Sequence, residues 1–147
     1  MKKMMFLAST VAILLSACNG GGDGANKIEQ LRGEAIAIHD EIMPQISVFD
    51  RNSVKIDSLL ANLPQLQTAY PDLDTTQTRV DLSALKAKLE QATDSMMDWM
   101  TEFDVDPQDK STTEIKEYYE EEVGKVKDMK QLFDQVSKES TDKLAQF

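Results

Sequence analysis

Apolar residues recur three and four positions apart over three long segments of this chain. That spacing places them on one face of an α-helix, which can then be buried against a neighbouring helix. The segments run from about residue 26 to 63, from about 79 to 103, and from Ser111 or Thr112 to near the C-terminus. No stretch shows the strict alternation of apolar and polar residues that indicates a β-strand. The pattern therefore predicts an all-α protein.

The second segment carries the most regular pattern. Its apolar residues have the heptad spacing of a coiled-coil seam: Leu82, Leu85, Leu89, Ala92, Met96, Trp99 and Phe103. The first segment has a similar stripe, formed by Ile28, Leu31, Ala35, Ile38, Ile42, Phe49, Ile56, Leu59 and Leu63. Pro44 lies inside this first segment and lacks a backbone N–H, so we expect a kink or a break near Ile42 and Met43.

The third segment continues the heptad spacing through Ile115, Tyr119, Val126, Met129, Phe133 and Val136. Ser111 offers an N-cap for this helix, with the acid Glu114 three residues later. Acidic residues and a lysine lie between the apolar positions, namely Glu117, Glu120, Glu121 and Lys125. We expect this Glu-rich stretch to be a solvated face of the helix.

The two connections between these helices indicate how they pack. Residues 64–78 are polar, hold two prolines and show no period, which predicts a loop, and Asp104 to Pro107 end the second helix. Short connections between long helices favour antiparallel neighbours with left-handed crossing. We therefore expect residues 26–147 to form an elongated, antiparallel, coiled-coil-like three-helix bundle. Such a rod leaves little room for an enclosed substrate pocket, which argues against an enzyme.

The N-terminal residues predict where the protein resides. Lys2 and Lys3 precede an apolar run, residues 4–15, that is too short to span a bilayer but has the length of a secretory signal peptide. The run ends in Leu-Ser-Ala-Cys, which resembles a bacterial lipobox, so residues 1–17 are expected to be removed and Cys18 to be lipidated, as with palmitate. An ordinary signal peptide with a nearby cysteine is the alternative. Residues 18–25, rich in glycine, are expected to form a flexible tether.

The net charge and the numbers of cysteine and histidine residues argue against several classes of function. The chain has 16 basic and 26 acidic residues, and the leader holds two of the lysines and no acid, so the mature chain has a net charge of −12. A surface so acidic argues against nucleic acid as a partner and against adsorption to anionic lipid. Cys18 is the only cysteine and His39 the only histidine, which excludes thiolate zinc sites in the mature fold and two-histidine metal motifs.

One cluster of residues is a candidate metal site. Antiparallel packing of the first two helices places residues 39–43 opposite residues 96–103, with Tyr118 or Tyr119 of the third helix at the same level. The soft-metal hypothesis assigns Cu(I) to imidazole and thioether ligands drawn from His39, Met43, Met96 and Met100. The alternative is that these residues only pack, because methionine fills gaps in helical cores beside aromatic rings such as Trp99.

Two segments also carry a family resemblance. Residues 39–44 have the form H-D-E-x-M-P, and residues 96–103 have the form M-M-x-W-M-x-x-F. In this order behind a lipobox, they resemble small lipoproteins of Bacteroidetes commonly labelled "viral A-type inclusion protein". The resemblance implies a helical fold and an envelope location and supplies no activity.

These observations predict a non-enzymatic, lipid-anchored interaction or structural module. The spacer after Cys18 holds one acid, Asp23, which favours the periplasmic side of the outer membrane over export to the cell surface. Its partners would be the membrane, through the lipid, and an envelope protein or a second copy of the chain, through the helices. The competing function is soft-metal binding.

Overall fold

A computed structural model describes residues 20–147 of the chain. This part contains four α-helices and no strand: α1 (Gly20–Ala61), α2 (Leu63–Ala69), α3 (Thr75–Glu102) and α4 (Thr112–Leu144). The all-α prediction is therefore confirmed for these residues. None of the four helices is both long enough and apolar enough to cross a membrane. The expected leader (1–17) and Cys18 lie outside the described residues.

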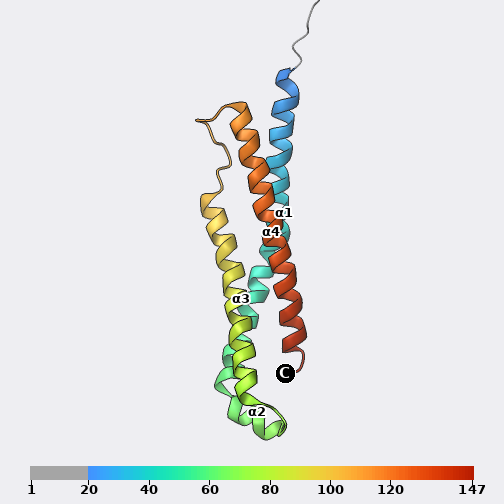
Figure 1. The fold of residues 1–147 in the computed structure, drawn as a ribbon, viewed down its shortest axis with the longest axis vertical. Coiled ribbons are helices and arrows are strands. Elements are labelled where there is room, and N and C mark those ends of the chain that lie inside the picture. The colour runs from blue at the N-terminus through green and yellow to red at the C-terminus, as the bar shows by residue number, and fades with distance from the viewer. Residues whose placement is uncertain (1–19) are drawn as a thin grey trace, which may run out of the picture.

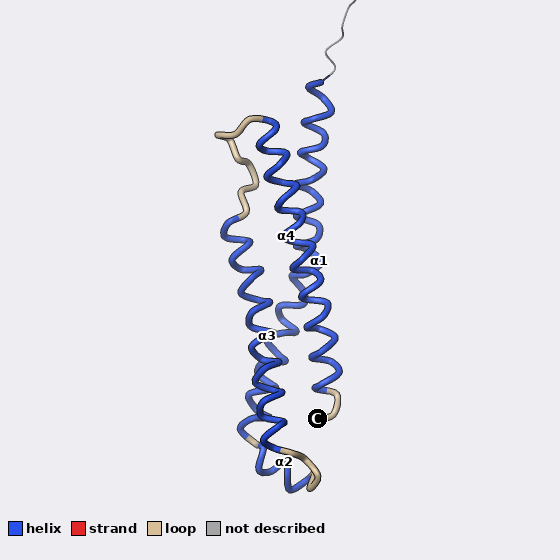
Figure 2. The backbone as a smooth tube through the Cα atoms, viewed as in Figure 1, coloured by secondary structure: helices blue, strands red, loops and turns tan. Residues whose placement is uncertain are grey.

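The three long helices lie side by side in an elongated rod (Figure 1). α1 runs from one end of the rod to the other, α2 turns the chain at the far end, and α3 returns antiparallel to α1. The connection of residues 103–111, drawn as a loop in Figure 2, lies at the end where α1 begins. α4 then runs in the same direction as α1 and shares its longest interface with that helix.

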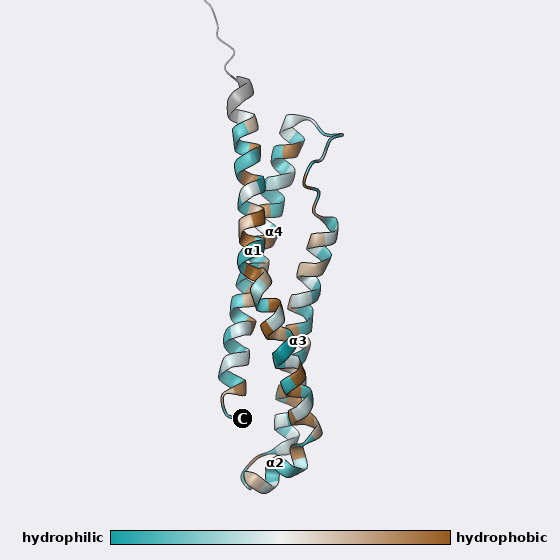
Figure 3. Ribbon diagram, turned by 180° about the vertical axis from the view of Figure 1, so that it is seen from behind, coloured by the Kyte–Doolittle hydropathy of each residue, from teal (hydrophilic) through white to brown (hydrophobic). Residues whose placement is uncertain are grey.

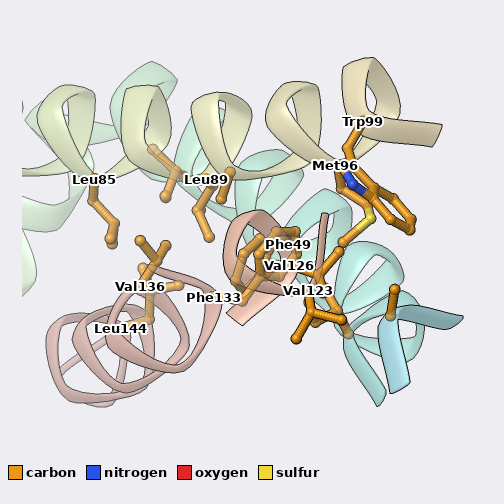
Figure 4. Packing of buried hydrophobic residues seen from close by; sticks show 14 of the residues in the cluster. Phe49, Leu85, Leu89, Met96, Trp99, Val123, Val126, Phe133, Val136 and Leu144 are labelled. Carbon is orange, nitrogen blue, oxygen red and sulfur yellow. The ribbon is translucent and has the colours of Figure 1, made fainter. Parts of the chain in front are cut away.

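One continuous core joins the long helices. Figure 3 shows strongly hydrophobic residues interspersed with hydrophilic ones along each helix, as amphipathic helices require. The predicted α3 seam is buried from Leu82 to Trp99, and Phe103 is half-buried. In Figure 4, Leu85 and Leu89 point from α3 toward Val136 of α4. Burial of these apolar side chains is the main favourable term that holds the rod together.

Phe49 and Phe133 form the centre of that core. Their rings stack with centroids 5.0 Å apart and planes 13° from parallel, and both side chains are essentially inaccessible to solvent (Figure 4). Offset stacking of this kind adds to the free energy gained from burial alone. The pair fixes α1 against α4 in the C-terminal half of both helices.

α1 differs from the expectation at its start and at Pro44. The structure places residues 20–25, expected to form a tether, in the first turns of α1. A Cβ on Gly24 would lie 3.5 Å from Cγ2 of Thr112, so α1 approaches the start of α4 at this residue. α1 also continues through Pro44 without the break that the sequence allowed. The buried side chains of Ile42 and Phe49 hold the helix on both sides of Pro44, and the kink stays a prediction.

The region expected to be a loop, residues 64–78, is largely helical. Pro64 lies in the first turn of α2, where a missing N–H costs nothing. The Asp74 carboxylate accepts hydrogen bonds from the backbone N–H groups of Thr76 and Gln77, both at 3.0 Å, and so begins α3 at Thr75, four residues earlier than expected. The periodicity missed α2 because this short helix has a single buried residue, Leu63.

The predicted cap of α4 is confirmed. Ser111 Oγ accepts a hydrogen bond from the N–H of Glu114 at 3.4 Å, and the Glu114 carboxylate accepts one from the N–H of Ser111 at 2.8 Å. These hydrogen bonds hold the pKa of Glu114 below its ordinary value. The capping box fixes where the 103–111 connection ends and α4 begins.

Replacing the stacked phenylalanine tests the importance of this core. We expect Phe133→Ala to lower the free energy of unfolding by about 3–5 kcal/mol, because it removes a buried ring and leaves a cavity. Urea unfolding followed by circular dichroism measures the change. Val54→Ala is the control, since Val54 is 69% exposed and its truncation should stay within about 0.5 kcal/mol. Equal losses in the two variants would contradict the central role of the pair.

An ion pair between α3 and α4 should make stability depend on pH. Lys88 donates to both carboxylate oxygens of Glu139, at 2.9 and 2.7 Å, and this hydrogen bonding lowers the pKa of Glu139. Because the pKa of Glu139 is lower in the folded than in the unfolded protein, its ion pair stabilises the fold at pH values above the ordinary pKa of glutamate. This stabilisation is lost as the pH falls through the lowered pKa and the carboxylate is protonated. Glu139→Gln should therefore lower Tm at neutral pH and match the unaltered protein in strong acid.

The size of that effect is limited by solvent. Lys88 is about half-exposed, so we expect the neutral-pH loss to be below about 1 kcal/mol. Thermal unfolding at a series of pH values measures it. Glu120→Gln, which alters an exposed acid paired only within α4, is the control and should lower Tm at neutral pH by less than Glu139→Gln does. A Glu139→Gln difference that persisted in strong acid would contradict the assignment to this ion pair.

Candidate functional site

The structure brings together the two segments that contain His39 and Trp99. His39 lies on α1 and Trp99 on the last full turns of α3, and their ring centroids are 5.7 Å apart with planes tilted by 33°. The antiparallel course of α1 and α3 produces this proximity, because residues far apart in the sequence come to the same level of the rod. His39 is mostly buried, with 19% of its side chain exposed.

The two residues border a surface groove that we name the Trp99 groove. Its volume is about 250 Å³. Its walls are Ile36, His39, Asp40, Trp99, Met100, Phe103 and Val105. Three of the apolar walls remain substantially exposed: Ile36 at 38%, Met100 at 42% and Val105 at 56%. The groove is thus an open, largely apolar hollow between α1 and the end of α3.

The four candidate metal ligands separate into two environments. His39 and Met100 line the Trp99 groove. Met96 is fully buried in the core, where Figure 4 shows it beside Trp99 on α3, and Met43 is partly buried and packs on the same core. Met43 and Met96 therefore have the environment of packing residues, and His39 and Met100 share an opening to solvent. Among the described residues, no three His, Cys, Asp or Glu side chains form a group able to hold a metal ion.

The two ring nitrogens of His39 have different surroundings. Nδ1 lies 2.9 Å from Oδ1 of Asp40, the next residue in the chain. Nε2 is shielded from solvent and has no hydrogen-bond partner among residues 20–147. Buried polar atoms are nearly always paired, so a buried nitrogen without a partner marks this ring as unusual.

Tyr118 and Tyr119 do not line the groove but secure the connection beside it. The hydroxyl of Tyr118 accepts a hydrogen bond from the N–H of Asp104 at 2.7 Å, and the hydroxyl of Tyr119 donates to the carbonyl of Val105 at 2.8 Å. Burial raises the pKa of both tyrosines above the ordinary value. Both rings also pack near Phe103, whose own ring stacks on Trp99 at 4.5 Å. This aromatic cluster holds Val105 at the rim of the Trp99 groove.

A buried acid, Glu122, binds the indole N–H of Trp99, and the sequence analysis did not identify this residue. The Nε1–H of Trp99 donates to Oε2 of Glu122 at 2.6 Å, and Glu122 is only 4% exposed. Lys125 donates to the other oxygen of Glu122 at 2.8 Å, and its bonds to Glu122 and then Glu121 raise the pKa of the lysine well above its ordinary value. The four residues predicted to form a solvated face, Glu117, Glu120, Glu121 and Lys125, are exposed, whereas Glu122, which that prediction did not name, is buried.

The heptad spacing contained the signal for this exception. Glu122 lies three residues after Tyr119 and four before Val126, so it occupies a seam position of α4. Glutamate at a seam position indicates a buried partner, because burying a carboxylate without one is costly. The sequence does not name that partner, which lies 23 residues away on α3.

Removing this acid tests the link between α3 and α4. We expect Glu122→Ala to lower the free energy of unfolding by about 1–3 kcal/mol, because it leaves the indole N–H of Trp99 buried without an acceptor. Urea unfolding, followed both by circular dichroism and by the fluorescence of the chain's single tryptophan, measures the loss. Glu121→Ala is the matched control, since Glu121 also binds Lys125 but is exposed, and it should stay within about 0.5 kcal/mol. Equal effects would contradict the role of Glu122.

Comparisons of this chain with protein-family models, with curated proteins and with solved structures found no match. The resemblance of residues 39–44 and 96–103 to Bacteroidetes lipoproteins therefore stays a prediction.

Proposed function

We propose that this protein is a lipid-anchored lipoprotein of the outer membrane that faces the periplasm and acts as a non-enzymatic interaction module. In this proposal the three long helices form an antiparallel, coiled-coil-like bundle, with a kink of α1 at Pro44, and Cys18 carries the lipid. The observation that carries the interaction role is the Trp99 groove with its exposed apolar walls. Contiguous exposed apolar surface on a protein otherwise rich in charge commonly marks a contact site.

The position of the groove along the rod suits a partner in the envelope. α1 begins at Gly20, two residues after the expected lipidation site. At 1.5 Å per residue, Ile36 lies about 24 Å along α1 from that start. An anchor at Cys18 would thus hold the groove above the lipid headgroups, on the side of the rod, where a neighbouring protein can reach it.

The charge around the groove favours a basic partner. Asp40 lines the groove, and Asp104 and Asp106 flank Val105 in the connection that forms its rim. All three acidic residues are exposed. A partner segment with an apolar anchor for the groove and basic flanks for these acids would be complementary in both respects. An envelope protein with such a segment is the proposed partner.

Site-specific photocrosslinking in living cells tests the proposal. A photoreactive residue at position 105, in the groove rim, should form one discrete adduct, identified by mass spectrometry as an envelope protein. The same residue at position 80 is the matched control, because Val80 is as exposed as Val105 (58% against 56%) but lies near the start of α3. Asp104→Lys in the same chain should weaken the position-105 adduct, because it reverses a rim charge.

Anchoring is tested in the same cells. Cys18→Ala should abolish incorporation of an alkynyl palmitate, release the protein from the outer-membrane fraction and reduce the position-105 adduct. Equal adducts from positions 80 and 105, or a crosslink only to a second copy of the chain, would contradict an envelope partner at the groove. A protein that kept its lipid label and membrane fraction without Cys18 would contradict the anchor.

A further inference from the structure

Nε2 of His39 is a buried nitrogen to which no group of residues 20–147 forms a hydrogen bond. It is shielded from solvent and has no hydrogen-bond partner, although the ring itself lines the Trp99 groove. Native proteins rarely leave a buried nitrogen unpaired, because the group loses its hydrogen bonds to water and gains none in return. Because His39 also lines the Trp99 groove, a ligand bound there that reaches the ring would supply the missing partner.

The contact with Asp40 determines what Nε2 can offer. A carboxylate accepts hydrogen bonds and donates none, so the 2.9 Å contact requires that Nδ1 of His39 carry the proton. In the neutral imidazole, Nε2 then keeps a free lone pair. This is the arrangement of a histidine that binds a metal through one nitrogen while a carboxylate orients the ring through the other.

The rest of the groove supplies one soft donor, Met100, and one carboxylate, Asp40. Met100 lines the same groove and is 42% exposed, so its thioether borders the same hollow as the imidazole of His39. The other walls are apolar except Asp40, which is engaged with Nδ1. Imidazole and thioether ligands together select a soft ion such as Cu(I), whereas carboxylates, carbonyls and water would select hard ions.

We propose that Nε2 of His39 and the thioether of Met100 bind one Cu(I) ion in the Trp99 groove. Asp40 is the positioning residue that orients the imidazole, and the ring of Trp99 lies alongside the site. Met96 is not a ligand, because it is fully buried within the core. The proposal does not depend on a protein partner at the groove and is tested without one.

The position of Trp99 gives a direct readout of binding. Trp99 is the only tryptophan of the chain, and its ring lies 5.7 Å from that of His39. One equivalent of Ag(I), a soft monovalent ion that needs no reducing agent, should quench the fluorescence of the full-length protein in detergent. Anaerobic competition for Cu(I) against bathocuproine disulfonate should give one tight site per chain.

Substitutions identify the ligands. Met100→Leu preserves volume and removes sulfur, and His39→Gln removes the imidazole; each should weaken Cu(I) binding by more than about tenfold. Met97→Leu is the matched control, because Met97 is an exposed neighbour at 50% that does not line the groove, and binding should be unchanged. Asp40→Asn should weaken binding by about tenfold while circular dichroism stays unchanged, as expected of a residue that orients a ligand.

Three results would overturn the site. The first is no Cu(I) binding in excess of the chelator and no quenching by Ag(I). The second is equal loss of affinity in Met97→Leu and Met100→Leu, which would indicate adventitious binding to surface thioethers. The third is a loss of affinity in Met96→Leu as large as that in Met100→Leu, which would place the ion in the core. None of these results bears on the crosslinking of position 105, so the two proposals fail separately.

Discussion

The hydrogen bond from Trp99 to Glu122 links the parts of this structure that matter for function. It joins α3 to α4 inside the core, with the acid almost fully buried and its second oxygen bonded to Lys125. The same indole ring presents a face to the Trp99 groove and stacks on Phe103. A buried hydrogen bond with such partners has one favourable geometry, so it fixes both the register of two helices and the floor of the groove.

A carboxylate in an apolar seam is not the most stabilising choice for that position. Burying the charge costs free energy that the bonds to Trp99 and Lys125 offset, whereas an apolar residue there would need no partner. Glu122 instead determines an orientation, because its hydrogen bond holds the indole ring of Trp99 in one position. The neighbouring Tyr119 contributes in the same way by bonding the carbonyl of Val105. The end of the rod that carries the groove is thus held by polar contacts as well as by aromatic packing, whereas Phe49 and Phe133 hold α1 against α4 by apolar stacking.

The Trp99 groove combines two properties that suit different ligands. Its exposed apolar walls and acidic rim are complementary to a basic, amphipathic segment of a partner. Its unpaired imidazole nitrogen and half-exposed thioether are complementary to a soft monovalent ion. Both depend on the same scaffold, since α1 supplies His39 and Ile36 and α3 supplies Trp99 and Met100.

The sequence by itself determined the three long helices, since heptad spacing from Leu82 to Trp99 and the Ser111 capping box are local signals that the fold kept. It also brought His39 level with Trp99, because an antiparallel pair has a register that follows from its turn. Only the tertiary structure decided the remainder. α1 lies against the start of α4 at Gly24 and continues through Pro44, and the packing of the three long helices buries Met96 while leaving Met100 partly exposed. These features depend on contacts between helices. The spacing of apolar residues within one helix does not specify which residues of a neighbouring helix it will contact.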